Sequence, residues 1–249
     1  MIWQHHHLPT VSSTNRWAIE WLRQHNPQGP VLFTTDHQTE GRGQRNRRWN
    51  SEAGRDVCLS LAFPAKPGWQ PANINMRVAL AVREAMLEHL PASQSTQAVL
   101  VKWPNDILVG KRKIAGILCE VISSTYAVVG IGVNLTSIPG DLAEENVCSL
   151  KDFGLGLHEE IAPLLGHLVR LLSNRWSDAS TLVESQTWEQ FFSTRLGTLG
   201  RKIQITLDDG SSWSGLASGL DSMGRLLVIP EGETIARALS SGDVRHLRA

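Results

Sequence analysis

Apolar positions repeat in two ways along the chain up to about residue 197. Alternation and short apolar runs predict strands at 3–11, 31–35, 57–63, 98–103, 107–109, 113–122 and 127–135. A helical period predicts helices at 14–25, 72–90, 158–176 and 183–196. In the helix at 72–90, Ile74, Val78, Val82 and Met86 share one face, which is therefore expected to be buried.

From Arg201 onward the pattern changes to short alternating strands at 202–207 and 226–229. Turn sequences, such as Asp209-Gly210 and Glu231-Gly232, separate them. Strands this short with such turns suggest a small antiparallel barrel. We therefore expect two domains, at residues 1–197 and 198–249.

Composition narrows the functional classes. The 249 residues allow one large and one small domain, and 24 basic residues balance 24 acidic ones. A dedicated nucleic-acid binder normally has a basic excess, so DNA is not an expected partner. The three cysteines lack metal-ligand spacing and suit a reducing compartment. No run of 18 apolar residues and no signal peptide occurs, which predicts a soluble, cytoplasmic protein without membrane contact.

The segment Gly41–Trp49 holds four arginines, two glycines and no acid. Arginine presents a donor fork that matches phosphate or carboxylate, and glycine allows close backbone approach. Trp49 offers an apolar plane for a ring. A solvated basic loop without a ligand is the alternative interpretation.

Three segments downstream support an anion site. Pro104 ends a strand before Asn105-Asp106, where Asp106 could hold Mg²⁺ with triphosphate oxygens or simply form a turn. Lys113 enters an apolar strand, where it is either solvated or placed to neutralise a carboxylate approaching a phosphate.

Gly130 and Gly132 share one strand face, so a flat ring or a packed helix could lie directly on the backbone. A G-x-G on a strand lacks the rest of a dinucleotide fingerprint. These segments together describe a site with a glycine floor, a lysine, a carboxylate that could hold a metal ion, and a basic lid. Such a site fits the activation of a carboxylate by ATP, in which two anions must be brought together.

The order and spacing of these segments resemble those of the biotin protein ligase family, also called biotin–[acetyl-CoA-carboxylase] ligase. The matching segments are 13–15, 38–43, 47–49, 102–106, 113–116, 130–134 and 240–244. The resemblance implies an α+β fold with a central mixed or antiparallel sheet and flanking helices, followed by an SH3-like barrel. It also implies that biotin and MgATP form biotinoyl-5′-AMP. The biotin is then transferred to a lysine of the biotin carboxyl carrier protein of acetyl-CoA carboxylase, by a monomer or weak homodimer.

The resemblance assigns roles to individual residues. Biotin-binding residues would be Ser13, Thr14, Asn15, Gln38, Arg42, Gly43, Gln44, Lys113, Gly116, Gly130 and Gly132. ATP- or adenylate-binding residues would be Arg42, Arg45, Arg47, Trp49, Asn105, Asp106, Lys113 and Asn134. Lys113, Arg42 and Asp106 would be catalytic, and Asp106 would be the Mg²⁺ ligand.

The chain also departs from the family. Gln44 and Asn46 stand where the family commonly has arginine and glycine. Asn tolerates left-handed backbone, so Asn46 is expected to preserve the loop path. Only twelve residues precede Ser13, too few for the helix-turn-helix of the family's repressors. This disfavours a biotin-sensing repressor.

A lipoate–protein ligase or octanoyltransferase is the main enzymatic rival to this interpretation, because such enzymes share the fold. Their Arg-Arg-x-x-Gly-Gly-Gly type of motif is missing, however, and no cysteine stands at the expected nucleophile position. An inactive binding module is also compatible with the sequence. It would be separated from a ligase by an ATP–pyrophosphate exchange assay with biotin.

Overall fold

The computed structural model describes residues 3–64, 71–90, 99–122, 126–136, 146–154, 166, 168–171, 192 and 194–247. The helices expected at 158–176 and 183–196 lie largely outside these residues. Seven strands form the main sheet: β1 (Gln4–Val11), β2 (Val31–Gln38), β3 (Asp56–Pro64), β4 (Val99–Lys102), β5 (Asp106–Val109), β6 (Arg112–Ile122) and β7 (Tyr126–Asn134). The α-helices α1 (Thr14–Gln24) and α2 (Pro71–His89) accompany it, residues 168–171 are also helical, and short 3₁₀ turns are η1 (Gln44–Asn46) and η2 (Leu150–Phe153).

The main sheet is mixed. Its strand order is β1-β2-β3-β7-β6-β5-β4, with β1 parallel to β2 and every other pair antiparallel. The parallel pair is possible because α1 forms the crossover between its strands. β2 runs three residues beyond the expected 31–35 because β1 stays beside it as far as the Val11–Gln38 pair. The expected central sheet with flanking helices is confirmed.

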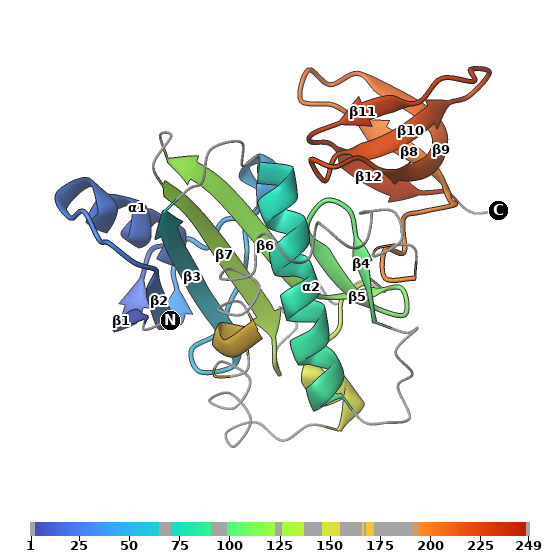
Figure 1. Ribbon diagram of the computed structural model, residues 1–249. Helices are drawn as coiled ribbons and strands as arrows, with labels where there is room; N and C mark the ends of the chain where they lie inside the picture. The colour runs from blue at the N-terminus through green and yellow to red at the C-terminus, as the bar shows by residue number, and fades with distance from the viewer. Residues whose placement is uncertain are drawn as a thin grey trace.

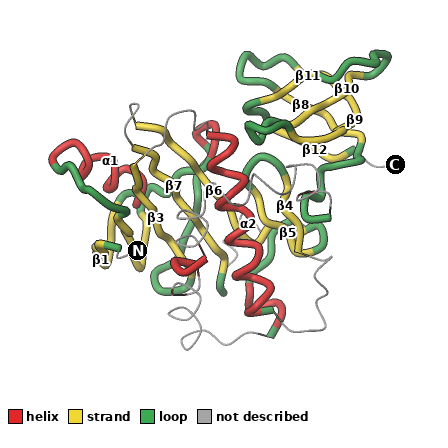
Figure 2. The backbone as a smooth tube through the Cα atoms, in the orientation of Figure 1, coloured by secondary structure: helices red, strands yellow, loops and turns green. Residues whose placement is uncertain are grey.

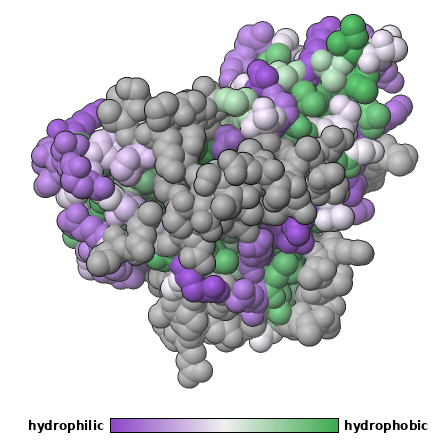
Figure 3. Space-filling view, in the orientation of Figure 1, coloured by the Kyte–Doolittle hydropathy of each residue, from purple (hydrophilic) through white to green (hydrophobic). Residues whose placement is uncertain are grey.

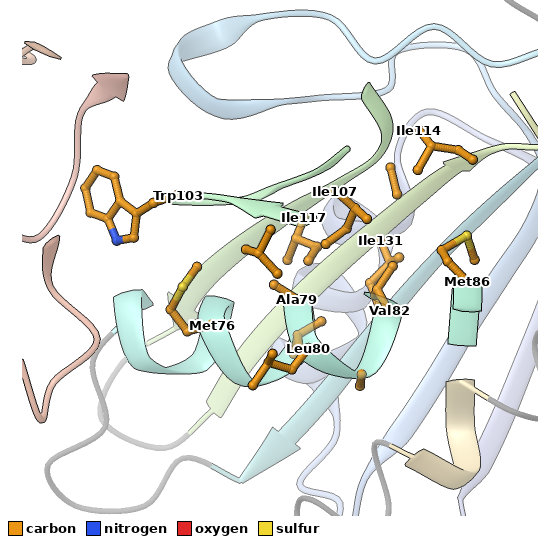
Figure 4. Close-up of a cluster of buried hydrophobic side chains, with 14 of the residues drawn as sticks. Met76, Ala79, Leu80, Val82, Met86, Trp103, Ile107, Ile114, Ile117 and Ile131 are labelled. Atoms are coloured by element: carbon orange, nitrogen blue, oxygen red, sulfur yellow. The ribbon is translucent and has the colours of Figure 1, made fainter. Parts of the chain in front are cut away.

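The two helices cover opposite faces of this sheet (Figure 1). Strand alternation explains the division: Leu59 and Leu61 of β3 belong to the core under α2, whereas Ala62 belongs to the cluster under α1. Met76, Ala79, Leu80, Val82 and Met86 of α2 lie over isoleucines of β5, β6 and β7 (Figure 4). The face of α2 expected to be buried is therefore buried.

Five antiparallel strands form the C-terminal sheet, with the order β11-β10-β9-β8-β12. They are β8 (Lys202–Thr206), β9 (Ser212–Leu220), β10 (Leu226–Pro230), β11 (Arg237–Leu239) and β12 (Asp243–His246). Figure 2 shows this second group of strands beside the β4 and β5 end of the main sheet. Trp103, just after β4, is 1% exposed and donates from Nε1 to Gly224 O at 3.2 Å, which fixes this junction.

The surface is predominantly hydrophilic over α1 and its neighbouring loops (Figure 3). On the side of α1 that faces the sheet, Trp17 and Trp21 pack with His6 and Phe33. His5 and His7 instead contact Thr34, so the three adjacent histidines alternate faces as strand geometry requires. Within the described residues, no helix is both long and apolar enough to span a membrane.

Candidate active site

A cavity of about 220 Å³ lies on the α1 face of the main sheet. Its wall contains these predicted site residues: Ser13, Thr14, Asn15, Gln38, Arg42, Gly43, Gln44, Arg47, Trp49, Asn105, Asp106, Lys113, Gly116, Gly130, Gly132 and Asn134. They come from the start of α1 and the residue before it, from β2 and the loop after it, and from β5 to β7 with the residue before β5. Segments distant in the sequence therefore meet in one concave site, as the anion-site interpretation requires.

Glycines form the floor of the cavity. Gly116 and Gly132 are paired across β6 and β7, and the Trp49 indole lies on them: a Cβ at Gly132 would overlap the ring. A Cβ at Gly130 would stand 2.5 Å from Asn15 Oδ1. The flat ring on this strand face is therefore the protein's own Trp49 indole, over Gly116 and Gly132. Asn15 lies beside the indole, over Gly130.

One end of the cavity is polar and uncharged. Ser13 precedes α1 with extended backbone, and its hydroxyl makes no capping bond, so the oxygen remains available at the wall. Thr14 donates its N–H and hydroxyl to Gln38 Oε1 at 2.8 and 3.1 Å. Ser60 Oγ lies 2.7 Å from Thr14 Oγ1 and 2.6 Å from Asn15 Oδ1. These five residues are at most 9% exposed, and the bonds among Thr14, Asn15, Gln38 and Ser60 form a pre-arranged network.

The other end carries charge. Lys113 Nζ lies 2.6 Å from Asp106 Oδ1 and 5.6 Å from the centre of the Trp49 ring. Asn105 donates through Nδ2 to Ile117 O at 3.0 Å, which leaves its side-chain oxygen as an acceptor. Asn134 is 6% exposed and donates to Cys148 O, so its amide braces the segment after β7.

The arginine loop closes over this end as a narrow hairpin. Gly43 N–H donates to Arg47 O and Trp49 N–H donates to Gly41 O. Arg47 lines the cavity and lies 3.1 Å from Asp243 Oδ2.

Two expectations for the loop need correction. Arg45 does not line the cavity, because its side chain turns outward to Asp208 Oδ1 at 2.9 Å and Thr206 O at 2.6 Å. The left-handed residue is Arg45, with φ 55°, and not Asn46. The two facts are related, since the left-handed backbone redirects the chain at this residue.

Several site residues were not predicted. Lys102, Arg48, Gly242, Asp243 and Val244 also line the cavity, the last three from the C-terminal sheet region. Ser60 and Glu120 lie behind the wall, bonded to Asn15. A signal existed for both: each is the polar residue within an otherwise apolar strand run.

Cysteine chemistry is disfavoured at this site. Burial raises the pKa of the Cys58 and Cys119 thiols to about 12, and that of Cys148 to about 11. All three therefore remain protonated at neutral pH, and a protonated thiol is a poor nucleophile. This argues against an acyl-cysteine intermediate, in agreement with the sequence interpretation.

The sequence matches the model of the biotin/lipoate A/B protein ligase family over residues 8–134. The biotin–[acetyl-CoA-carboxylase] ligase of Mycobacterium tuberculosis is 30% identical over 88% of this chain and 79% of its own length. The bifunctional ligase/repressor BirA of Bacillus subtilis is also 30% identical, over 88% and 67%. The Aquifex aeolicus biotin protein ligase, solved with biotin and ATP, has the same fold, with a TM-score of 0.76, 23% identity and 99% of each chain covered. The chain belongs to the biotin/lipoate A/B protein ligase family.

Proposed function

We propose that this protein is an ATP-dependent ligase that converts biotin to biotinoyl-5′-AMP and transfers the biotin to a lysine of the biotin carboxyl carrier protein of acetyl-CoA carboxylase. One observation carries the proposal: a single cavity joins a buried, uncharged polar end to a basic end. Biotin has the same division, with a neutral ureido ring at one end and a carboxylate at the other. The relatives named as biotin–[acetyl-CoA-carboxylase] ligases support the same substrate.

The polar end would hold the ureido ring. Ser13, Thr14, Asn15 and Gln38 supply hydroxyl and amide groups, which can accept and donate hydrogen bonds to a neutral ring. An alkyl or dithiolane substrate, as in octanoate or lipoate, would leave the open positions of this end, such as the Ser13 hydroxyl, unpaired, at a cost of about 1–3 kcal/mol each. The geometry therefore favours biotin over lipoate or octanoate.

The basic end would hold the two reacting anions. Arg42 and Lys113 would bind the biotin carboxylate and the α-phosphate, and Arg47 and Gln44 would extend the contact from the loop. Trp49 and Asn134 would border the adenine. An incoming phosphate would replace Asp106 as the partner of Lys113, which lies 2.6 Å from it. Positive groups at this position offset anion repulsion in the ground state and stabilise charge in the transition state.

The donor set near Asp106 also fits Mg²⁺. Among the described residues, no cluster of three or more His, Cys, Asp or Glu side chains could hold a metal ion. Asp106 stands beside the Asn105 amide at the cavity wall. Since Mg²⁺ commonly combines one or two carboxylates with phosphate oxygens, Asp106 would hold an ion that enters with ATP. The ion would supply further neutralisation of the triphosphate.

The chemistry balances in two steps without a covalent enzyme intermediate. A carboxylate oxygen of biotin attacks the α-phosphorus of ATP, the bond to the β-phosphate oxygen breaks and pyrophosphate leaves. The ε-amine of the carrier lysine then attacks the acyl carbon, AMP leaves and the amine loses a proton. The loop from Gly41 to Trp49 would shield the adenylate from water between the steps. Catalysis would rest on positioning and electrostatics.

We assign the two expected domains different parts in this reaction. Residues 1–197 would supply the floor, the polar end and Lys113, whereas 198–249 would contribute the Gly242–Val244 wall and the partners of the loop arginines. Three free cysteines are consistent with reaction in the reducing cytoplasm.

The test is biotin labelling of a purified carboxyl carrier domain in the presence of MgATP. The expected result is one biotin per carrier, no labelling after substitution of its acceptor lysine by arginine, and loss of labelling with EDTA. Equal transfer of lipoate would contradict the substrate assignment. Adenylate formation without transfer would contradict the carrier assignment.

A further inference from the structure

We propose that Glu120 is a positioning residue that holds Arg42 and Asn15 in the orientation required for adenylation. This inference rests on the proposed function and deepens it. Glu120 does not line the cavity; its carboxylate lies behind the wall, between one residue from each end of the site.

The contacts of Glu120 are close and shared. Oε2 accepts from Asn15 Nδ2 at 2.7 Å and from Arg42 Nη2 at 2.9 Å, and Oε1 lies 3.0 Å from the same Nη2. Its side chain is 27% exposed. Glu120 belongs to β6, where it is paired with Val128 of β7, so the carboxylate is carried by a strand that is hydrogen-bonded into the main sheet. A group on such a strand can fix partners that come from a helix and from a loop.

The first effect concerns Asn15. Its Nδ2 donates one hydrogen to Glu120 and the other to Leu118 O at 3.2 Å. Both hydrogens are therefore used, and the amide oxygen faces Ser60 and the space over Gly130. Asn15 can then present only an acceptor to a ligand. An acceptor at the polar end complements an N–H donor, which the ureido ring has and an alkyl chain lacks.

The second effect concerns Arg42. Glu120 holds one terminal nitrogen, and within the described part of the chain the other nitrogens of Arg42 make no hydrogen bond to protein. The guanidinium is therefore anchored at one corner and keeps donors for an anion. Without Glu120 the arginine would have to be ordered by the substrate itself, at a cost in binding free energy.

Glu120→Gln tests the proposal with little change in volume. The amide has one acceptor oxygen where the carboxylate has two, and its NH₂ group would face either the Asn15 amide or the Arg42 guanidinium. We expect KM for biotin in pyrophosphate exchange to rise about tenfold, the size of one charge-assisted hydrogen bond, with KM for ATP little changed. Glu233→Gln is the matched control, because it breaks a similar 2.6 Å pair with Arg237 in the C-terminal sheet.

A merely structural role predicts a different pattern. A partly unfolded variant would lower kcat through its active fraction and leave KM for biotin unchanged, and this result would overturn the proposal. A double-mutant cycle adds a second criterion: Asn15→Ala should raise KM for biotin by a clearly smaller factor in the Glu120→Gln background than in wild type. Independent effects of the two substitutions on KM for biotin would also overturn the proposal.

One readout does not depend on biotin. Because Glu120 anchors Arg42, Glu120→Gln should accelerate tryptic cleavage within the Gly41–Trp49 loop several-fold relative to Glu233→Gln. Equal cleavage would contradict the anchoring role. A wild-type protein that exchanges no pyrophosphate with biotin would instead defeat the proposed function, and the proteolysis result would still decide whether Glu120 orders the loop.

Discussion

The two ends of the cavity are built differently. At the polar end, Thr14, Asn15 and Ser60 are at most 3% exposed and satisfy one another through short hydrogen bonds. At the basic end, the loop arginines are held by ion pairs at the surface: the side chains of Arg47 and Asp243 are 59% and 46% exposed. Buried networks are rigid and costly to break, whereas exposed ion pairs contribute about 0–1 kcal/mol each.

This difference matches the chemistry proposed for each end. A neutral ring gains most from donors and acceptors that are already in place, because it has no charge to offset the cost of reordering them. An anion can instead displace an exposed carboxylate from its arginine at little cost. The comparison predicts that substitutions at the polar end change KM for biotin, and that substitutions at the basic end change the rate of adenylation and the retention of the adenylate.

Lys113→Ala should produce the largest effect. Removal of one pre-organised donor to developing charge typically lowers a rate by about two orders of magnitude, and we expect at least this loss in adenylation. Lys111→Ala is the control, because Lys111 is an exposed lysine in the turn just before β6 that does not line the cavity. Single-turnover formation of biotinoyl-AMP is the measurement. Normal adenylation with impaired transfer would show that Lys113 acts in the second step.

Alanine at the floor glycines should separate the two ends. At Gly130 a methyl group would displace Asn15, and at Gly132 it would displace Trp49. We expect Gly130→Ala to raise KM for biotin and Gly132→Ala to raise KM for ATP, each by about tenfold or more, since overpacking costs about 1–3 kcal/mol. In Gly219→Ala the new methyl group meets only Leu227, at an ordinary 3.7 Å, so this variant is the control. Identical changes in both variants would contradict a divided site.

Gln44→Arg should have a smaller effect, of about 1 kcal/mol, because charge-assisted hydrogen bonds are roughly twice as strong as neutral ones and the loop is partly screened by water. The added charge should slow release of biotinoyl-AMP and reduce labelling of bystander lysines. A chase after single-turnover adenylation measures the release rate. Unchanged or faster release would mean that Gln44 points away from the phosphate. Arg47 would then make this contact, because Arg45 turns outward to Asp208.

Asp208→Asn should have the smallest effect. It removes the charge that pairs with Arg45 and accepts from Ser241, and the Asp208 side chain is 68% exposed. We expect the free energy of unfolding to fall by less than about 1 kcal/mol. Chemical denaturation at low and high salt measures this change, and the difference from wild type should shrink as salt is added. A loss of several kcal/mol would show that the loop contacts hold the two sheets together.

Most strands and the main helices could be predicted from sequence because local apolar periodicity specifies them. The positions of Gly130, Lys113 and Asp106 in one site could also be anticipated, since glycine and charged residues in apolar runs are informative. The outward turn of Arg45 could not, because it depends on its left-handed backbone and on Asp208, 163 residues away. Glu120 stands out as a polar residue in an apolar strand run, but its role could not be anticipated, since that role depends on two partners from other elements.

The most direct test of the divided cavity is ATP–pyrophosphate exchange with biotin, lipoate and octanoate at equal concentrations. We predict exchange that depends on biotin and on Mg²⁺, with lipoate and octanoate poor substrates because neither offers hydrogen-bond donors and acceptors to the polar end around Ser13, Asn15 and Gln38. Exchange with lipoate at the rate seen with biotin would contradict the account, since the buried polar end would then contribute nothing to substrate choice.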